Sequence, residues 1–148
     1  MVCIRRSAKR DLPRIVSFYA RSQYGQALSE EDILLIAEQG EEICGALRLC
    51  PEEGVLILRG MRIAENWQRG GIGRRLLLRA AEELAAQECF CIPHRYLKAF
   101  YGEAGFEEIE PPTAPTFLEE RLAKYRTELG LDVILMRREA EQHPRPGV

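Results

Sequence analysis

The sequence predicts a single domain of the mixed α/β class (α+β mixed), in which an antiparallel meander of strands feeds one parallel strand–helix–strand crossover. The chain has 148 residues, 46% of them hydrophobic, which is enough for one core and short for two. Strand-like runs at residues 33–36, 43–50 and 55–63 follow one another, and a glycine-rich turn then leads into an amphipathic helix. We expect the domain to cover residues 1–140 and the tail, residues 141–148, to be mobile.

The opening residues, Met1 to Arg6, alternate apolar and polar side chains as a strand does, and a helix should follow. Asp11 is positioned to cap that helix, and Pro13 is tolerated in its first turn. The apolar positions of the helix recur at three-to-four spacing, at Leu12, Ile15, Val16 and Tyr19. A loop then runs to Ser29, with room for a second short helix.

The tetrad from Ser29 to Asp32 matches a capping box, which on its own favours a helix through residues 33–36. We expect a strand instead, because the apolar run is short, ends at Gln39-Gly40 and is followed at once by a second strand-like run. The two runs then form an antiparallel hairpin. A turn ending at Gly54 leads into the third strand of the meander.

After the glycine-rich turn, residues 74–86 carry one apolar stripe and are predicted to be helical. The stripe comprises Leu76, Leu77, Ala80, Ala81, Leu84 and Ala85. A buried strand at residues 89–92, stopped by Pro93, makes the crossover right-handed and parallel. The later elements are expected to be a helix at 94–104 closed by a left-handed Gly105, a strand at 106–109, a helix from Thr116 to Gly130, and a last strand at 131–136.

Composition excludes several classes of protein. The net charge of −2 argues against a dedicated nucleic-acid binder, which is usually strongly basic. No apolar run approaches the ~18 residues that span a bilayer, and the start lacks signal-peptide features, so we expect a cytoplasmic protein with no membrane partner. Five cysteines are an odd number, and we expect those in strand-like runs to be reduced and buried: Cys44, Cys50, Cys89 and Cys91. No metal site is expected, because the chain has only two histidines and no second cysteine pair.

The turn from Gln68 to Gly73 has the features of a phosphate-binding site. Glycines let the backbone come close to a ligand, and amides at a helix start point outward with the positive end of the helix dipole behind them. A nucleotide P-loop is excluded, because Arg74 and Arg75 stand where Lys and Ser or Thr are needed. A dinucleotide fingerprint is disfavoured, because Leu76 stands in place of its third glycine.

The pattern Gln68-x-x-Gly71-x-Gly73 resembles the cofactor loop of the GNAT superfamily of N-acetyltransferases, which is Gln or Arg, two residues, Gly, one residue, then Gly or Ala. The segment Phe100-Tyr101-Gly102-Glu103-Ala104-Gly105-Phe106 is similar to that family's Phe-Tyr-Glu-Lys-x-Gly-Phe. Upstream, Met61-x-Ile63 matches the apolar end of its splayed fourth strand. The resemblance covers the chain from Ile4 to Ile109, with the motifs in the family's order.

This resemblance implies a three-layer domain, with helices on both faces of a mostly antiparallel sheet that splays beside the fourth strand. Acetyl-CoA would lie in that gap, and CoA would be the product. Backbone groups at the end of the fourth strand would face the acetyl end, and the amides of the glycine turn would hold the pyrophosphate. The cofactor-binding residues implied are Met61, Ile63, Gln68, Arg69, Gly70, Gly71, Ile72, Gly73, Arg74 and His94, the last standing where the family commonly has Asn.

The resemblance also implies the reaction, which is direct transfer of the acetyl group to a primary amine of a small molecule or protein. Tyr101 matches the family's general acid, since a phenol with a pKa of about 10 is protonated at neutral pH and can donate to the departing sulfur. Glu65 is the candidate general base, with water chains as the alternative. A non-catalytic acyl-CoA-binding or sensing module is the competing hypothesis, because no base is obvious and His94 departs from the pattern.

The acceptor is expected on the side of the first helix and its loop, where Tyr19, Arg21 and Tyr24 lie, and beside the insert at residues 111–130. Arg21 would suit an acceptor that carries a carboxylate or phosphate. No nucleic-acid partner is expected, and a homodimer is allowed.

Overall fold

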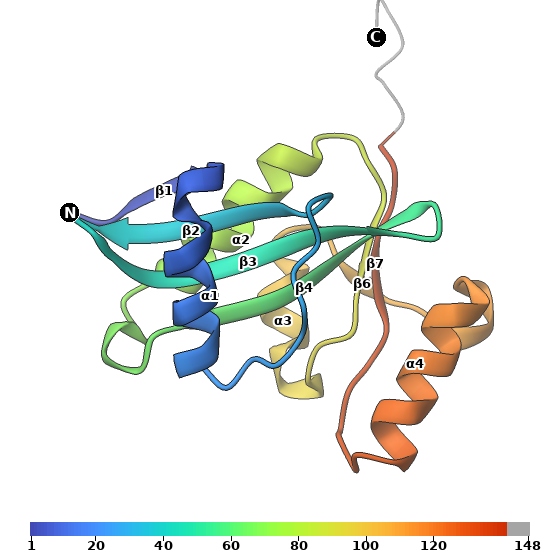
Figure 1. Ribbon diagram of the computed structural model, residues 1–148. Helices are drawn as coiled ribbons and strands as arrows, with labels where there is room; N and C mark the ends of the chain where they lie inside the picture. Colours follow the sequence, from blue (N-terminus) through green and yellow to red (C-terminus); the bar gives the residue numbers. More distant parts are fainter. Residues whose placement is uncertain (142–148) are drawn as a thin grey trace, which may run out of the picture. The chain divides into compact units, whose positions relative to one another are not determined.

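The computed structural model describes residues 1–141, and its backbone contacts group the chain into two compact units (Figure 1). The first unit is Met1–Glu83 and the second begins at Leu84; each is described by itself. Residues 142–148 of the predicted mobile tail lie outside the described residues. Among residues 1–141, no helix combines the length and the apolar character needed to cross a membrane.

The first unit is built on four antiparallel strands that follow one another along the chain: β1 (Cys3–Arg6), β2 (Ile33–Gln39), β3 (Glu42–Glu52) and β4 (Val55–Ile63). The predicted hairpin and meander are therefore confirmed. Two residues connect β3 to β4, Glu53 at φ 46° and Gly54 at φ 86°. This pair of positive φ angles is what a type I′ turn requires, and such a turn matches the twist of the paired strands.

The capping-box sequence before β2 forms a turn and not a helix. The Ser29 amide donates to Asp32 Oδ2 at 3.0 Å, and the Asp32 amide donates to the Ser29 carbonyl at 3.1 Å. These bonds close the turn on itself, and the chain enters β2 at Ile33. The loop at residues 22–32 contains no helix, so the second short helix for which the sequence has room is not formed.

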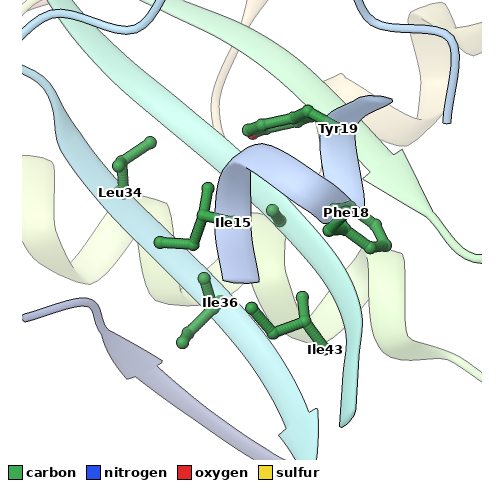
Figure 2. Close-up of a cluster of buried hydrophobic side chains, with 7 residues drawn as sticks. Ile15, Phe18, Tyr19, Leu34, Ile36 and Ile43 are labelled. Atoms are coloured by element: carbon green, nitrogen blue, oxygen red, sulfur yellow. The ribbon is translucent and has the colours of Figure 1, made fainter. Parts of the chain in front are cut away.

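Helix α1 (Leu12–Arg21) covers one face of the meander through Ile15, Phe18 and Tyr19. Figure 2 shows these side chains packed with Leu34 and Ile36 of β2. The predicted stripe was partly wrong, because Leu12 and Val16 are 45% and 52% exposed while Phe18 is buried. The buried face consists of residues 15, 18 and 19, which follow i, i+3, i+4 spacing. The helix is therefore rotated relative to the prediction, which placed Leu12 and Val16 on the buried face.

Asp11 does not cap α1, contrary to the prediction. Its carboxylate accepts hydrogen bonds from the Ala8 amide at 2.7 Å and from the guanidinium groups of Arg5 and Arg14 at 2.8 Å each. Those arginines also bind Glu38, at 2.6 and 3.1 Å. Asp11 therefore joins β1 to α1 through Arg5 and Arg14, and the same arginines bind β2 through Glu38. Its position before a helix did not reveal this role.

Helix α2 (Ile72–Leu84) packs on the opposite face of the meander from α1, behind it in Figure 1. A Cβ added to Gly45 of β3 would come within 3.0 Å of Leu76 and 3.3 Å of Ile72, whereas the next residue, Ala46, belongs to the α1 cluster. Successive strand residues face opposite sides, so the first unit has three layers. The helix begins two residues earlier than predicted and ends at Leu84, since Ala85 adopts φ 50°.

Within its described residues, 84–141, the second unit contains three short strands in the order β5-β7-β6, paired antiparallel: β5 (Cys89–Cys91), β6 (Glu107–Glu108) and β7 (Met136–Arg138). Its helices are α3 (Lys98–Gly102) and α4 (Thr116–Thr127). Gly105 and Gly130 adopt φ 90° and φ 63°, as expected for residues that end helical segments.

Two predictions for the second unit need correction. The segment at 94–104 is not one helix: a 3₁₀ turn, η3 (Arg95–Leu97), precedes α3, whose last residue is Gly102. The last strand begins at Met136, where it was expected to end. Residues before it run beside Pro93 and His94, where the Ile134 amide donates to the Pro93 carbonyl at 3.0 Å. Proline has no amide to donate in return, so a regular ladder starts only opposite Cys91.

Candidate functional site

The end of β4 carries a β-bulge, formed by Gly60 and Met61. Ala46 pairs with Arg62 and Arg48 pairs with Arg59, so two residues of β4 lie opposite Leu47 alone. Gly60 adopts φ 65°, a left-handed conformation that favours glycine. A bulge interrupts the regular ladder and redirects the backbone groups around it. Backbone donors at this point are therefore not all committed to the sheet.

The residues after β4 are tied back to the strand end. The Gln68 side-chain Nε2 donates to the Ile63 carbonyl at 3.1 Å, and the Ala64 amide donates to the Cys44 carbonyl at 2.8 Å. A 3₁₀ turn, η2 (Glu65–Trp67), lies between these two bonds. Gln68 thus sets the distance between the end of β4 and the glycine turn, and Glu65 is exposed on the connecting turn.

The glycine turn is an open helix start. Arg69 and Gly71 adopt φ 69° and φ 83°, and the Arg75 amide donates to the Gly71 carbonyl at 3.1 Å as α2 begins. Amides in the first turn of a helix have no intrahelical partner, which applies here to those of Ile72 and Gly73. A Cβ at Gly71 would meet nothing within 4 Å, so the backbone here is open to a ligand.

Side chains at the turn have separate roles. Ile72 is buried against the meander, so this residue presents only its backbone to the turn. Arg69 and Arg74 are exposed cations beside it. The Arg75 guanidinium donates to the Val2 carbonyl at 2.9 Å and so is directed toward the N-terminal segment. The positive end of the α2 dipole and the exposed arginines together suit an anion at this helix start.

Tyr101 is buried on α3, with 5% of its surface exposed. Its ring makes edge-to-face contacts with Phe100 at 5.1 Å and Phe106 at 6.1 Å between centroids. Its carbonyl accepts hydrogen bonds from the amides of Ala104 and Phe106. The matched motif therefore folds as a short helix that closes on its own aromatic side chains.

The predicted site residues fall in both units. The first unit brings together Met61, Ile63, Gln68 and the glycine turn, with Glu65 on the connection between them. Tyr101 and His94 belong to the second unit. His94 is exposed and stacks on Tyr96, with 5.6 Å between ring centroids.

A buried network of polar side chains lies beside the bulge, and the sequence pattern did not predict it. Arg48, on β3, forms an ion pair with Asp32 at 2.7 Å, and their side chains are 3% and 2% exposed. Its guanidinium also donates to the Tyr24 hydroxyl and, at 3.0 Å, to the Ala27 carbonyl. A signal was present, because an arginine inside a run of apolar strand residues is rarely buried without a carboxylate partner.

Of the three residues expected on the acceptor side, Tyr19 and Tyr24 lie at the bulge. The Tyr19 hydroxyl donates to the Gly60 carbonyl at 2.9 Å, and Arg62 stacks over the Tyr24 ring at 5.1 Å. Arg21 is exposed and donates to Ser17 Oγ at 2.8 Å. The exposed cation next to the bulge is therefore Arg62.

Cysteine chemistry does not contribute to this arrangement. Cys44, Cys50, Cys89 and Cys91 are buried free thiols, as predicted, and Cys3 is exposed. Burial raises the pKa of Cys50 to about 12 and that of Cys91 well above its ordinary value. In the part of the chain that the structure describes, no group of three or more His, Cys, Asp or Glu side chains is arranged to hold a metal ion.

These observations define a mixed α/β protein in which a bulged strand leads into an open helix start whose amides and exposed arginines suit an anion. A family model described as an acetyltransferase (GNAT) domain matches residues 9–119, so the chain belongs to the GNAT acetyltransferase family. The predicted family is confirmed, and with it an acetyltransferase whose acyl donor is acetyl-CoA. No curated protein matches the sequence.

Solved structures share the fold. N-acetylglutamate synthase from Neisseria gonorrhoeae, complexed with coenzyme A and N-acetyl-glutamate, has a TM-score of 0.68 at 20% identity, over 96% of this chain and 36% of that one. The ribosomal-protein-S18-alanine N-acetyltransferase from Escherichia coli has a TM-score of 0.69 at 19% identity, over 99% and 98%. Escherichia coli ElaA has a TM-score of 0.68 at 13% identity, over 94% and 100%. This likeness confirms the predicted fold class. The chain spans only 36% of the length of the synthase.

Proposed function

We propose that the protein transfers an acetyl group from acetyl-CoA to a primary amine of a small molecule or protein, by direct attack of the amine in a ternary complex. The observation that carries the proposal is that the bulged end of β4 and the open start of α2 are joined by one short, tethered connection. The names of two structural neighbours, a synthase of N-acetylglutamate and an alanine N-acetyltransferase, support an amine as acceptor.

In this proposal the glycine turn binds the cofactor's pyrophosphate through its amides, from Arg69 to Arg74, and the two arginines at its ends add positive charge. Gln68 holds the turn at its distance from β4. Backbone groups of Met61 and Ile63 face the acetyl end of the pantetheine arm, and His94 supplies a polar contact to that arm.

The chemistry consists of one acyl substitution. The amine nitrogen attacks the thioester carbonyl carbon, a C–N bond forms and the C–S bond breaks. Negative charge that develops on the carbonyl oxygen is stabilised by a backbone amide at the end of β4. The thiolate takes a proton from Tyr101, and the nitrogen loses a proton to Glu65 or to water. The products are the N-acetylated amine and CoA.

Thiol release from acetyl-CoA over a panel of small amines and amine-bearing peptides tests this function. Release that requires an acceptor is the expected result. If the protein binds acetyl-CoA tightly and releases no thiol with any acceptor, it is a non-catalytic acyl-CoA-binding module. If it binds no CoA species at millimolar concentration, the cofactor site is wrong as well.

The substitution Tyr101→Phe tests the general acid. The ring contacts with Phe100 and Phe106 do not need the hydroxyl, so the fold should persist. We expect kcat to fall by about 100-fold or more, because general acid catalysis contributes at least that in many enzymes. Equal turnover of wild type and Tyr101→Phe across the pH range would remove Tyr101 from the mechanism.

A further inference from the structure

The bulge on β4 is enclosed by side chains of the α1 face. A Cβ added to Gly60 would lie 3.1 Å from Arg48 Cδ, 3.1 Å from the Tyr19 hydroxyl oxygen and 3.1 Å from Tyr24 Cζ. Contacts at that distance are tighter than nine in ten real Cβ contacts. The bulge therefore has little room to change shape while these three side chains stay in place.

Tyr19 fixes the direction of one peptide group in the bulge. Its hydroxyl donates to the Gly60 carbonyl at 2.9 Å. The peptide bond between Gly60 and Met61 is trans and planar, so its C=O and N–H point in opposite directions. The Met61 amide is therefore directed away from Tyr19. Burial raises the pKa of Tyr19, so its hydroxyl stays protonated and remains the donor in this bond.

The ring of Tyr19 is itself held by the buried network. Its centroid lies 4.7 Å from that of Tyr24, whose hydroxyl accepts a hydrogen bond from Arg48. Arg48 reaches Asp32 with two nitrogens, Nε at 3.0 Å and Nη2 at 2.7 Å. Breaking such a buried pair would leave an uncompensated charge, so the pair holds the residues that it joins in one arrangement. The residues held here belong to the loop after α1, and Tyr24 of that loop packs against Tyr19 at the bulge.

We propose that Tyr19 is a positioning residue that aims the Met61 amide at the carbonyl oxygen of bound acetyl-CoA, with Tyr24, Arg48 and Asp32 holding Tyr19 in place. The inference rests on the proposed function, in which a backbone amide at the end of β4 meets the developing negative charge. Tyr19 does not touch the reacting atoms; it acts only through the peptide group that it binds. A donor that is held in place before the reaction stabilises charge without reorganisation in the transition state.

The substitution Tyr19→Phe tests the inference, because it removes one hydrogen bond and leaves the ring contacts with Phe18 and Tyr24. Loss of a whole oxyanion donor costs about 100- to 1,000-fold in kcat, and a misdirected donor should cost less, about tenfold. We expect that drop in kcat with KM for acetyl-CoA unchanged. A purely structural tyrosine would instead lower Tm and leave kcat unchanged, which would overturn the inference.

A second measurement does not depend on turnover. The amide resonance of Met61, followed by ¹⁵N NMR, should shift more with acetyl-CoA than with CoA, because only acetyl-CoA has the carbonyl that the amide would meet. In Tyr19→Phe this difference should shrink. Equal shifts with the two ligands in the wild type would overturn the inference even if amines are acetylated. Absence of thiol release from any amine, with the acetyl-dependent shift present, would instead contradict the proposed function alone.

Discussion

Gly71 gives a sharp test of the proposed pyrophosphate site, because backbone strain can be separated from steric clash there. The residue adopts φ +83°, and a Cβ would meet nothing within 4 Å. Gly71→Ala therefore introduces no clash, and its cost is the strain of a left-handed alanine, about 1–2 kcal/mol.

This strain can lower either the stability of the free protein or its affinity for the cofactor, depending on which state requires the left-handed conformation of Gly71. Gly71 is exposed and lies just before α2, so without ligand the turn is free to relax into a conformation that alanine prefers. Binding of the pyrophosphate requires the original conformation, so the strain is added to the binding free energy. A cost of about 1–2 kcal/mol corresponds to a rise in Kd of about 5- to 30-fold.

Isothermal titration with CoA and acetyl-CoA, together with Tm, measures both quantities. Gly40→Ala is the matched control: Gly40 has φ +60° and equally open surroundings, but it lies in the hairpin between β2 and β3. Its strain should appear as a lower Tm with Kd unchanged. If Gly71→Ala behaves like this control, the turn holds its shape without the cofactor and does not bind the pyrophosphate, and the reasoning is refuted.

Two further predictions concern stability and thiol chemistry. Hydrogen bonds from Arg5 hold the pKa of Asp11 and of Glu38 below the usual carboxylate range, and Arg14 adds to the effect. The unfolded pKa of such carboxylates is about 4, so above this pH both groups stabilise the folded state. This stability is lost as the pH falls toward their folded-state pKa values. Asp11→Asn should therefore lower the free energy of unfolding, measured by urea titration, by about 2 kcal/mol at pH 7. Below about pH 4 this free energy should decrease less steeply with pH in the variant than in the wild type. Parallel plots of unfolding free energy against pH for the two proteins would contradict this. A thiol reagent at neutral pH should label only Cys3 in the native protein and all five cysteines after denaturation, and rapid labelling of a second thiol would show that a buried strand opens.

The sequence by itself determined features that depend on neighbouring residues. Short apolar runs that are closed by turn residues predicted the meander, because runs of this length and spacing are typical of antiparallel hairpins. The glycines of the turn after β4, and the segment around Tyr101, identified the family before any contact was known. Prediction from local sequence was wrong where a long-range contact replaces the local interaction that the sequence favours. Asp11 binds Arg5 and Arg14 and does not cap α1.

Tertiary structure alone decided what surrounds the bulge. The bonds from Arg48 to Asp32, from Arg48 to Tyr24 and from Tyr19 to Gly60 join residues 16, 24 and 41 positions apart. No periodicity or turn signal spans such distances, since these partners meet only when β2, β3 and β4 pair and α1 packs across them. The sequence by itself predicted a phosphate-binding turn after the fourth strand and determined its glycine-rich composition. The packing of α1 and its loop decided how the peptide group between Gly60 and Met61, in the bulge of that strand, is held.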